Sequence, residues 1–226
     1  MEPAPVFPPF GLRVTSGDLE LRLPDDEVLA RLADVALAGV HAPDARPFQR
    51  EWNLGDPARV RIDLLQFHWK RRAAMTAESW ALELAVFRDG VLVGVQGANA
   101  TGFPLLRTAE TESWLGLEHQ GQGIGKRMRL MMLHLLFEGF GAVEATTGAF
   151  SDNSRSNGLT RSLGYTANGQ VRHDRQGEAV TEYRYRMPRE TWDARPEAQR
   201  PDVTLEGVAP VRAMLGMDGP EKAPQP

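Results

Sequence analysis

The stretch Gln120-Gly121-Gln122-Gly123-Ile124-Gly125-Lys126 decides the fold. It lies between a predicted strand, 108–117, and a predicted amphipathic helix, 126–138. Alternate glycines at a strand-to-helix junction leave several backbone N–H groups free to face one anion, and the positive end of the helix favours that anion. The stretch therefore predicts a cradle for a phosphate or pyrophosphate group.

Two familiar phosphate loops do not fit this stretch. A Walker A loop needs glycine where Gln120 stands and serine or threonine where Arg127 stands. A dinucleotide-binding fingerprint follows the first strand of a parallel sheet. Here the glycines come about halfway along the chain, after an antiparallel hairpin signalled by Asp89-Gly90 and a third predicted strand.

The remaining signals predict strands and helices on either side of the glycine loop. Strands or hairpins are expected at 12–14, 19–23, 80–88, 91–100, 143–150, 165–173 and 180–187, and helices at 25–38, 57–74 and 152–163. The order β-α-α-β-β-β-α-β-α-β-β predicts an α/β (α+β) fold. We expect a mixed, mostly antiparallel sheet of about six to seven strands with helices on both faces.

The length of 226 residues favours a single domain, which we place at 11–192. Residues 1–10 read as an N-terminal extension. Residues 193–226 read as a proline-rich, partly ordered tail in which 208–217 docks as a helix.

The amino-acid composition limits the kinds of partner and site that the protein is expected to have. A net charge of −4 argues against nucleic acid as the main partner. The absence of cysteine excludes disulfides, thiolate metal sites and a cysteine nucleophile. No apolar run reaches about 18 residues, and Met1–Phe10 has four prolines and no basic residue. We therefore expect a cytoplasmic protein with no membrane partner, and the histidine spacing suggests no metal site.

A second polar motif follows the strand after the glycine-loop helix: Asn153-Ser154-Arg155-Ser156, with Leu163-Gly164-Tyr165 beyond it. One interpretation is helix capping alone, by Asp152 or Asn153. The other is that two splayed strands place a polar side chain of this helix opposite the cradle.

Together the two motifs resemble those of the GNAT superfamily of acyl-CoA-dependent N-acyltransferases. Residues 120–125 match its Q/R-x-x-G-x-G/A loop. Asn153-x-x-Ser156 with Leu163-Gly164-Tyr165, and Trp114-Leu115 ahead of the loop, resemble the RimJ/RimL-like branch. The specific motifs cover 110–165, and the element order extends the resemblance to about 12–187.

The resemblance implies roles for individual residues. The CoA pyrophosphate would lie on the loop, gripped by backbone N–H groups from Gln122 to Lys126. Leu115 and Leu117 would pair by main chain with the pantetheine arm, Asn153 would hold that arm, and Ser156 would protonate the departing thiolate. The full expected cofactor-binding set is Leu115, Leu117, Gln120, Gly121, Gln122, Gly123, Ile124, Gly125, Lys126 and Asn153.

An alkylammonium acceptor has a pKa near 10, so acyl transfer at neutral pH needs a base. Glu110 and Glu112 are two apart on a strand and point to one face. Glu110 is the first choice as base and Glu112 the second. This chain departs from the related branch at Glu112, where glycine is common. The alternative is two solvated carboxylates. Trp52 in the 41–57 loop is the candidate for the acceptor wall.

These inferences predict an acetyltransferase that moves an acetyl group from acetyl-CoA to a primary amine by direct transfer in a ternary complex, without a metal. The acceptor is a protein N-terminus or a small amine. A longer donor such as succinyl-CoA, a non-catalytic acyl-CoA sensor and a nucleotide-triphosphate enzyme are the alternatives. A homodimer is expected from the resemblance.

Overall fold

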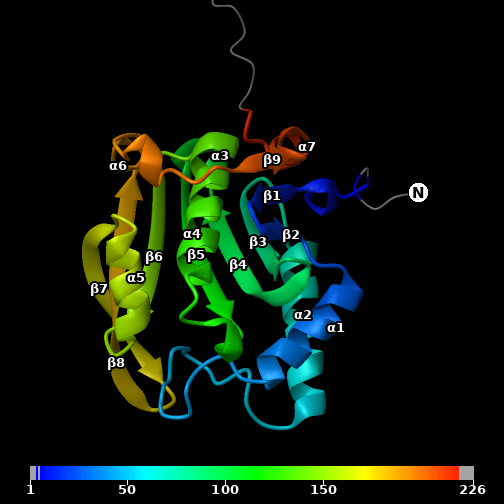
Figure 1. Ribbon diagram of the computed structural model, residues 1–226, viewed down its shortest axis with the longest axis vertical. Coiled ribbons are helices and arrows are strands. Elements are labelled where there is room, and N and C mark those ends of the chain that lie inside the picture. Colours follow the sequence, from blue (N-terminus) through cyan, green and yellow to red (C-terminus); the bar gives the residue numbers. More distant parts are fainter. Residues whose placement is uncertain (1–3, 5, 219–226) are drawn as a thin grey trace, which may run out of the picture.

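A single open sheet forms the centre of the protein in the computed structural model, which describes residue 4 and residues 6–218. The strand order is β7-β8-β6-β5-β4-β3-β2-β1-β9 (Figure 1). All neighbours pair antiparallel except β5 and β6, which are parallel. The strands are β1 (Arg13–Ser16), β2 (Leu19–Arg22), β3 (Ser79–Arg88), β4 (Val91–Thr101), β5 (Thr108–Leu115), β6 (Glu144–Phe150), β7 (Thr166–Arg175), β8 (Glu178–Pro188) and β9 (Thr204–Glu206).

Helices cover both faces of the sheet, each over its own apolar cluster. One face carries α1 and α2, and the other carries α4 and the C-terminal helices. The α-helices are α1 (Asp26–Leu37), α2 (Pro57–Ala73), α3 (Phe103–Leu106), α4 (Ile124–His134), α5 (Ser154–Ser162), α6 (Arg189–Asp193) and α7 (Val208–Met214). A π-helical turn, η3 (Leu135–Gly139), extends α4, and short 3-10 turns lie at η1 (Pro8–Gly11), η2 (Leu117–His119) and η4 (Glu197–Gln199). The predicted fold class is confirmed.

Local sequence signals account for most of the element boundaries. The carboxylates of Asp25 and Asp56 accept the backbone N–H of the third residue on and so start α1 and α2. Asp89 and Gly90 both have positive φ, 48° and 77°, as a tight hairpin turn requires. The two helix starts and the hairpin turn were predicted from these same residues.

The sheet has nine strands in the described residues, so the expected six to seven was wrong. The chain opens with a two-stranded hairpin, and β9 adds a strand from the segment after Trp192 by pairing with β1. The segment 208–217 docks as predicted: it forms α7 and buries Val211, Leu215 and Met217. The strand before the glycine loop ends at Leu115 instead of residue 117, because the chain turns at Gly116 into η2.

The parallel pair β5–β6 is the feature that positions the site. Its register covers only three residue pairs, from Thr108–Glu144 to Glu110–Thr146. Beyond that point the two strands separate, and side chains bridge them: Thr147 Oγ1 donates to the Thr111 carbonyl at 2.9 Å. The separation opens the middle of the sheet between α4 and α5.

In residues 6–218, no helix is long and apolar enough to cross a lipid bilayer.

Candidate active site at the separation of two strands

The glycine loop carries a row of unpaired backbone donors. Gly121 and Gly123 have left-handed φ values of 74° and 80°. A Cβ built on either one meets no atom within 4 Å, so the space in front of them is open. In the described part of the chain, the N–H groups of 121–126 donate to no protein acceptor, and the next, that of Arg127, donates to the Gly123 carbonyl. This geometry fits the predicted anion cradle at the start of α4.

Two glutamines brace the loop from its sides. Gln120 Nε2 donates to the carbonyls of Val40, at 2.8 Å, and Leu115, at 3.0 Å. Gln122 accepts from Arg88 Nη1 at 2.7 Å and donates to the Glu118 carbonyl at 2.8 Å. The side chains of both glutamines therefore hold the loop in shape, while its backbone and the exposed Lys126 remain available to a ligand.

The edge of β5 that faces β6 has no strand partner beyond Glu110. Leu115 lies on that strand with its side chain buried near Gly125. Leu117 lies in η2, where its N–H donates to the Gly39 carbonyl at 2.8 Å and its carbonyl accepts from the Gln120 N–H. Of the two residues expected to pair with the pantetheine arm, only Leu115 is on the strand.

Helix α5 faces this open edge. Asn153 Oδ1 accepts from the Ser156 N–H at 3.1 Å, so the capping interpretation of Asn153 is confirmed. The Ser156 hydroxyl lies on the first turn and accepts a hydrogen bond from Arg129 Nη2 of α4 at 3.3 Å. The structure therefore brings Ser156, the glycine-loop helix and the free edge of β5 together.

Glu110 and Glu112 point to the opposite face of the sheet, the one that α1 and α2 cover. Arg184 Nη2 of β8 lies 2.8 Å from Glu110 Oε1. Arg71 Nη2 of α2 lies 3.1 Å from Glu112 Oε1. Each carboxylate is therefore oriented by an arginine, and Arg184 also contacts Glu182 of β8 at 3.0 Å.

A third carboxyl, Glu83 of β3, lies beside Glu112 and was not predicted. It is 4% exposed, and Gly97 of β4 makes room for both side chains: a Cβ there would be 2.6 Å from Glu83 Oε2 and 3.0 Å from Glu112 Cγ. Burial, reinforced by the charge of Glu112, raises the pKa of Glu83 to about 8, against the influence of Arg71. A carboxyl with this pKa can exchange protons near neutral pH.

An aromatic cluster lines the same face. Trp52 stacks in a tilted arrangement against Phe48 and against Trp114, with ring centroids 5.4 Å apart in both pairs. Trp114 follows Glu112 by two residues on β5, so its ring lies on the face of the carboxylates. The structure therefore places Trp52 against Trp114, on the face of the candidate bases, and adds Phe48 and Trp114 to the wall.

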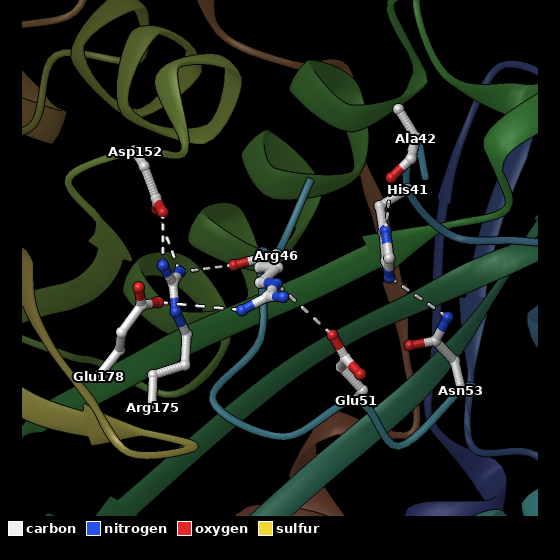
Figure 2. A network of polar contacts seen from close by, with 8 residues as sticks. All are labelled: His41, Ala42, Arg46, Glu51, Asn53, Asp152, Arg175 and Glu178. Carbon is white, nitrogen blue, oxygen red and sulfur yellow. Dashed lines mark hydrogen bonds and ion pairs between the residues drawn. The ribbon is translucent and has the colours of Figure 1, made fainter. Parts of the chain in front are cut away.

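Trp52 belongs to a strap, residues 39–56, that leaves α1, passes the lower end of β5 in Figure 1, reaches the β7–β8 turn and returns to α2. Figure 2 shows how the strap is fastened. The Arg175 guanidinium donates to the Arg46 carbonyl at 2.7 Å and pairs with Asp152 at 2.6 Å, and Arg46 contacts Glu51 and Glu178. At the other end, Asn53 bonds to His41.

Asp152 directly precedes the cap of α5, and the Arg175 guanidinium lowers the pKa of its carboxyl. Arg175 of β7 therefore links the strap, through the Arg46 carbonyl, with Asp152 at the start of the helix that carries Ser156.

Within the described residues, no group of three or more histidine, aspartate or glutamate side chains is arranged to hold a metal ion.

Solved structures with this fold include several acetyltransferases. One is RimL, the ribosomal L7/L12 alpha-N-protein acetyltransferase in complex with coenzyme A, with a TM-score of 0.62 and 21% identity over 76% of this chain and 95% of that one. Another is an acetyltransferase from Salmonella typhimurium described as modifying the N-terminal serine of L7/L12, with a TM-score of 0.61 and 20% identity over 76% and 96% of the chains.

A third is the microcin C7 self-immunity acetyltransferase MccE in complex with acetyl-CoA and AMP, with a TM-score of 0.58 and 17% identity over 76% and 92%. At these identities the similarity establishes the fold. Residues 19–166, more than half of the chain, match the family of the acetyltransferase (GNAT) domain. The protein belongs to the GNAT family of acetyltransferases, as its two motifs predicted.

The sequence did not lead us to name Glu83 and Arg129 as site residues, although each is an unusual charge in its segment. Glu83 is the only charged residue in the apolar run 80–87, and Arg129 interrupts the methionine-rich helix that follows the loop. Either residue would have been a candidate as a lone charge among core positions.

Proposed function

We propose that the protein transfers the acetyl group of acetyl-CoA directly to a primary amine within a ternary complex. The observation that carries the proposal is the opening between β5 and β6. Free loop amides and the Ser156 hydroxyl lie on one side of it, and carboxylates lie on the other. CoA and amine would therefore approach one point in the sheet from opposite faces.

The loop 120–126 would hold the pyrophosphate, and the free edge of β5 near Leu115 would pair with the pantetheine arm. Asn153 would support that arm through its position at the start of α5. These roles are supported by the unpaired N–H groups of the loop, by the open space in front of Gly121 and Gly123, and by the complexes of RimL with CoA and MccE with acetyl-CoA.

On the other face, Glu110 would take the proton of the acceptor nitrogen, directly or through one water molecule, with Glu112 as the second candidate. The nitrogen attacks the thioester carbonyl, the carbon–sulfur bond breaks, and Ser156 gives a proton to the sulfur. The carboxylates also attract a cationic amine, and the ring of Trp52 would flank it.

Calorimetric titration with acetyl-CoA, succinyl-CoA and ATP tests the donor. Acetyl-CoA is expected to bind, and ATP is not. Tight succinyl-CoA binding with weak acetyl-CoA binding would identify succinyl-CoA as the donor. ATP binding without CoA binding would overturn the proposal.

Release of the CoA thiol in the presence of an amine panel tests the reaction. The panel comprises peptides with N-terminal serine, alanine or methionine, a peptide with an internal lysine, and polyamines. Turnover on at least one amine supports an enzyme, and no turnover on any favours an acyl-CoA sensor. Ser156→Ala should lower turnover about ten- to ten-thousand-fold with little change in CoA affinity. Ser162→Ala, at the exposed end of α5, is the matched control.

A further inference from the structure

Arg129 of α4 is a partly buried cation whose hydrogen-bond partners are all hydroxyl groups. Its Nε donates to Ser113 Oγ at 3.2 Å, its Nη1 to Thr160 Oγ1 at 3.0 Å, and its Nη2 to Ser156 Oγ at 3.3 Å. Among the described residues, no carboxylate lies within ion-pair distance of it. Burial lowers the pKa of the Arg129 guanidinium, with only the Tyr165 hydroxyl acting in the opposite direction.

This arrangement is unfavourable for a residue that only fills space. Burying a charge without an opposite charge destabilises a protein, and three neutral hydroxyls compensate a guanidinium poorly. Most other arginines described here pair with a carboxylate or a backbone carbonyl, as Arg175 and Arg189 do. An uncompensated cation is useful where negative charge develops during a reaction.

The position of Arg129 matches such a place. Ser113 lies on the part of β5 that has separated from β6, while Ser156 and Thr160 lie on α5. The guanidinium therefore spans the opening from the strand to the helix. Ser113 alternates with Glu112 along β5, so Arg129 lies on the donor side of the sheet, away from the carboxylates.

The hydrogen bond at Ser156 also fixes what that hydroxyl can do. A hydroxyl has one O–H to donate and lone pairs to accept with. Because the Ser156 oxygen accepts from Arg129, and a guanidinium has no lone pair to offer in return, the Ser156 O–H must point elsewhere. A cation that donates to this oxygen also stabilises the negative charge that grows on it as the proton leaves.

We propose that Arg129 is the positioning residue that makes Ser156 an effective proton donor to the departing thiolate; this rests on the proposed acyl transfer. When the carbon–sulfur bond breaks, its electron pair stays on sulfur. Ser156 passes its proton to that sulfur and regains one from solvent, while the proton of the amine has gone to the base. Arg129 itself stays protonated throughout and holds the serine oxygen.

The first test needs no acceptor amine. CoA is bound to the protein, and the pKa of its thiol is measured from the absorbance of the thiolate as pH is varied. The same titration of the complex with dethio-CoA, which has no thiol, gives the background absorbance to be subtracted. Arg129→Met should raise the pKa of the bound thiol by about one unit, a tenfold change in ionisation, and Arg129→Lys should raise it less. Ser156→Ala should raise it similarly. Tyr165, the other titratable group near Arg129, contributes little in this range because burial raises its pKa.

The double variant decides whether Arg129 acts through Ser156. If it does, combining Arg129→Met with Ser156→Ala raises the thiol pKa no further than the larger single change. Full additivity would overturn the proposal. With an amine from the panel, Arg129→Met should lower kcat about ten- to a hundredfold while the KM for acetyl-CoA changes little. Arg161→Met, an exposed arginine of α5, is the control.

Other outcomes separate the two proposals. An unchanged thiol pKa and kcat in Arg129→Met, while Ser156→Ala is impaired, would overturn this inference and leave the acyl transfer standing. Failure of the unaltered protein to bind CoA would instead overturn the proposed function. If Arg129→Met does not fold, Arg129→Gln and Arg129→Lys are compared, and equal thiol pKa values in those two variants would also overturn the inference.

Discussion

Glu110 and Glu112 are neighbours on one face of β5, yet each is held by an arginine from a different element, Arg184 of β8 and Arg71 of α2. Glu110 stands at the last paired position of the β5–β6 ladder, where the strands begin to separate. Of the two carboxylates, Glu110 is therefore the closer in register to the start of the opening, which makes it the better candidate for the base.

Glu110→Gln should lower kcat/KM at neutral pH about a hundredfold or more, because a neutral amide accepts no proton. Glu112→Gln should have a smaller effect, and Glu78→Gln, an exposed carboxylate just before β3, serves as the control. The measurement is kcat/KM for the best amine across pH. A larger loss in Glu112→Gln would transfer the role to Glu112. If both variants keep the activity of the unaltered protein, neither glutamate is the base, and Glu83 is the next residue to test.

His68 of α2 gives a prediction about stability. It is 3% exposed, and burial, together with the charges of Arg72 and Arg71, lowers its pKa to about 4. An unfolded histidine titrates near pH 6.5, so between pH 6.5 and about 4 the unfolded state binds more protons. The free energy of unfolding therefore falls as pH is lowered through this window, by roughly 3 kcal/mol in total from this residue.

His68→Leu removes this contribution because leucine does not titrate. Urea unfolding at pH 7.5 and 4.5 should show a smaller loss of stability in the variant than in the unaltered protein. The carboxylates are the same in both, so the difference isolates His68. Equal losses would mean that His68 is protonated in the folded protein.

At the scale of elements, the turn from β5 into α4 makes the clearest prediction. Gly123→Leu places a side chain in the open space in front of the loop and should weaken acetyl-CoA binding at least about tenfold. Gly90→Leu in the β3–β4 turn has nearly the same φ, 77° against 80°, and equally open surroundings, so it imposes similar backbone strain away from the loop. Calorimetric titration of both variants separates strain from obstruction, and equal losses of affinity would argue against the cradle.

The elements also show how far the sequence could predict the structure. Helix starts and hairpin turns depend on residues close in the chain, such as Asp25, Asp56 and Asp89-Gly90, and these predictions were confirmed. The strand β9 has only three residues, too few for an alternating pattern to stand out in the sequence. It exists only because β1 offers a distant edge, which no local signal contains.

The same distinction applies to the site. The glycine loop and Asn153-x-x-Ser156 are local motifs, so the sequence alone pointed to the donor side. Glu83 became a candidate only through its position beside Glu112 across Gly97, and Arg129 only through hydroxyls from β5 and α5. Tertiary contacts set the pKa and orientation of both side chains, so sequence reasoning could not assign them.

At the scale of the whole molecule, the strap joins the two sides of the opening. It covers the carboxylate face with Phe48 and Trp52, and Arg175 fastens it to Asp152 at the start of α5. Movement of α5 and movement of the strap are therefore mechanically linked, in a region where acceptor and donor would meet.

Arg175→Met should loosen the strap by leaving Asp152 and the Arg46 carbonyl without their donor. We expect faster hydrogen exchange in residues 42–54 and a KM for the amine raised about three- to tenfold, with acetyl-CoA affinity largely retained. Arg172→Met, an exposed arginine on the same strand, is the control. Unchanged exchange in the strap would show that Arg175 does not fasten it.

The pairing of β9 with β1 has a consequence for how the protein is made. Val14 lies opposite Leu205, so β1 is synthesised well before β9, the strand that pairs with its outer edge. Until then β1 presents an open edge, and contacts of such long range form slowly because a large loop must close first. During synthesis, the growing chain therefore relies on β2 and β3 to hold β1 in place.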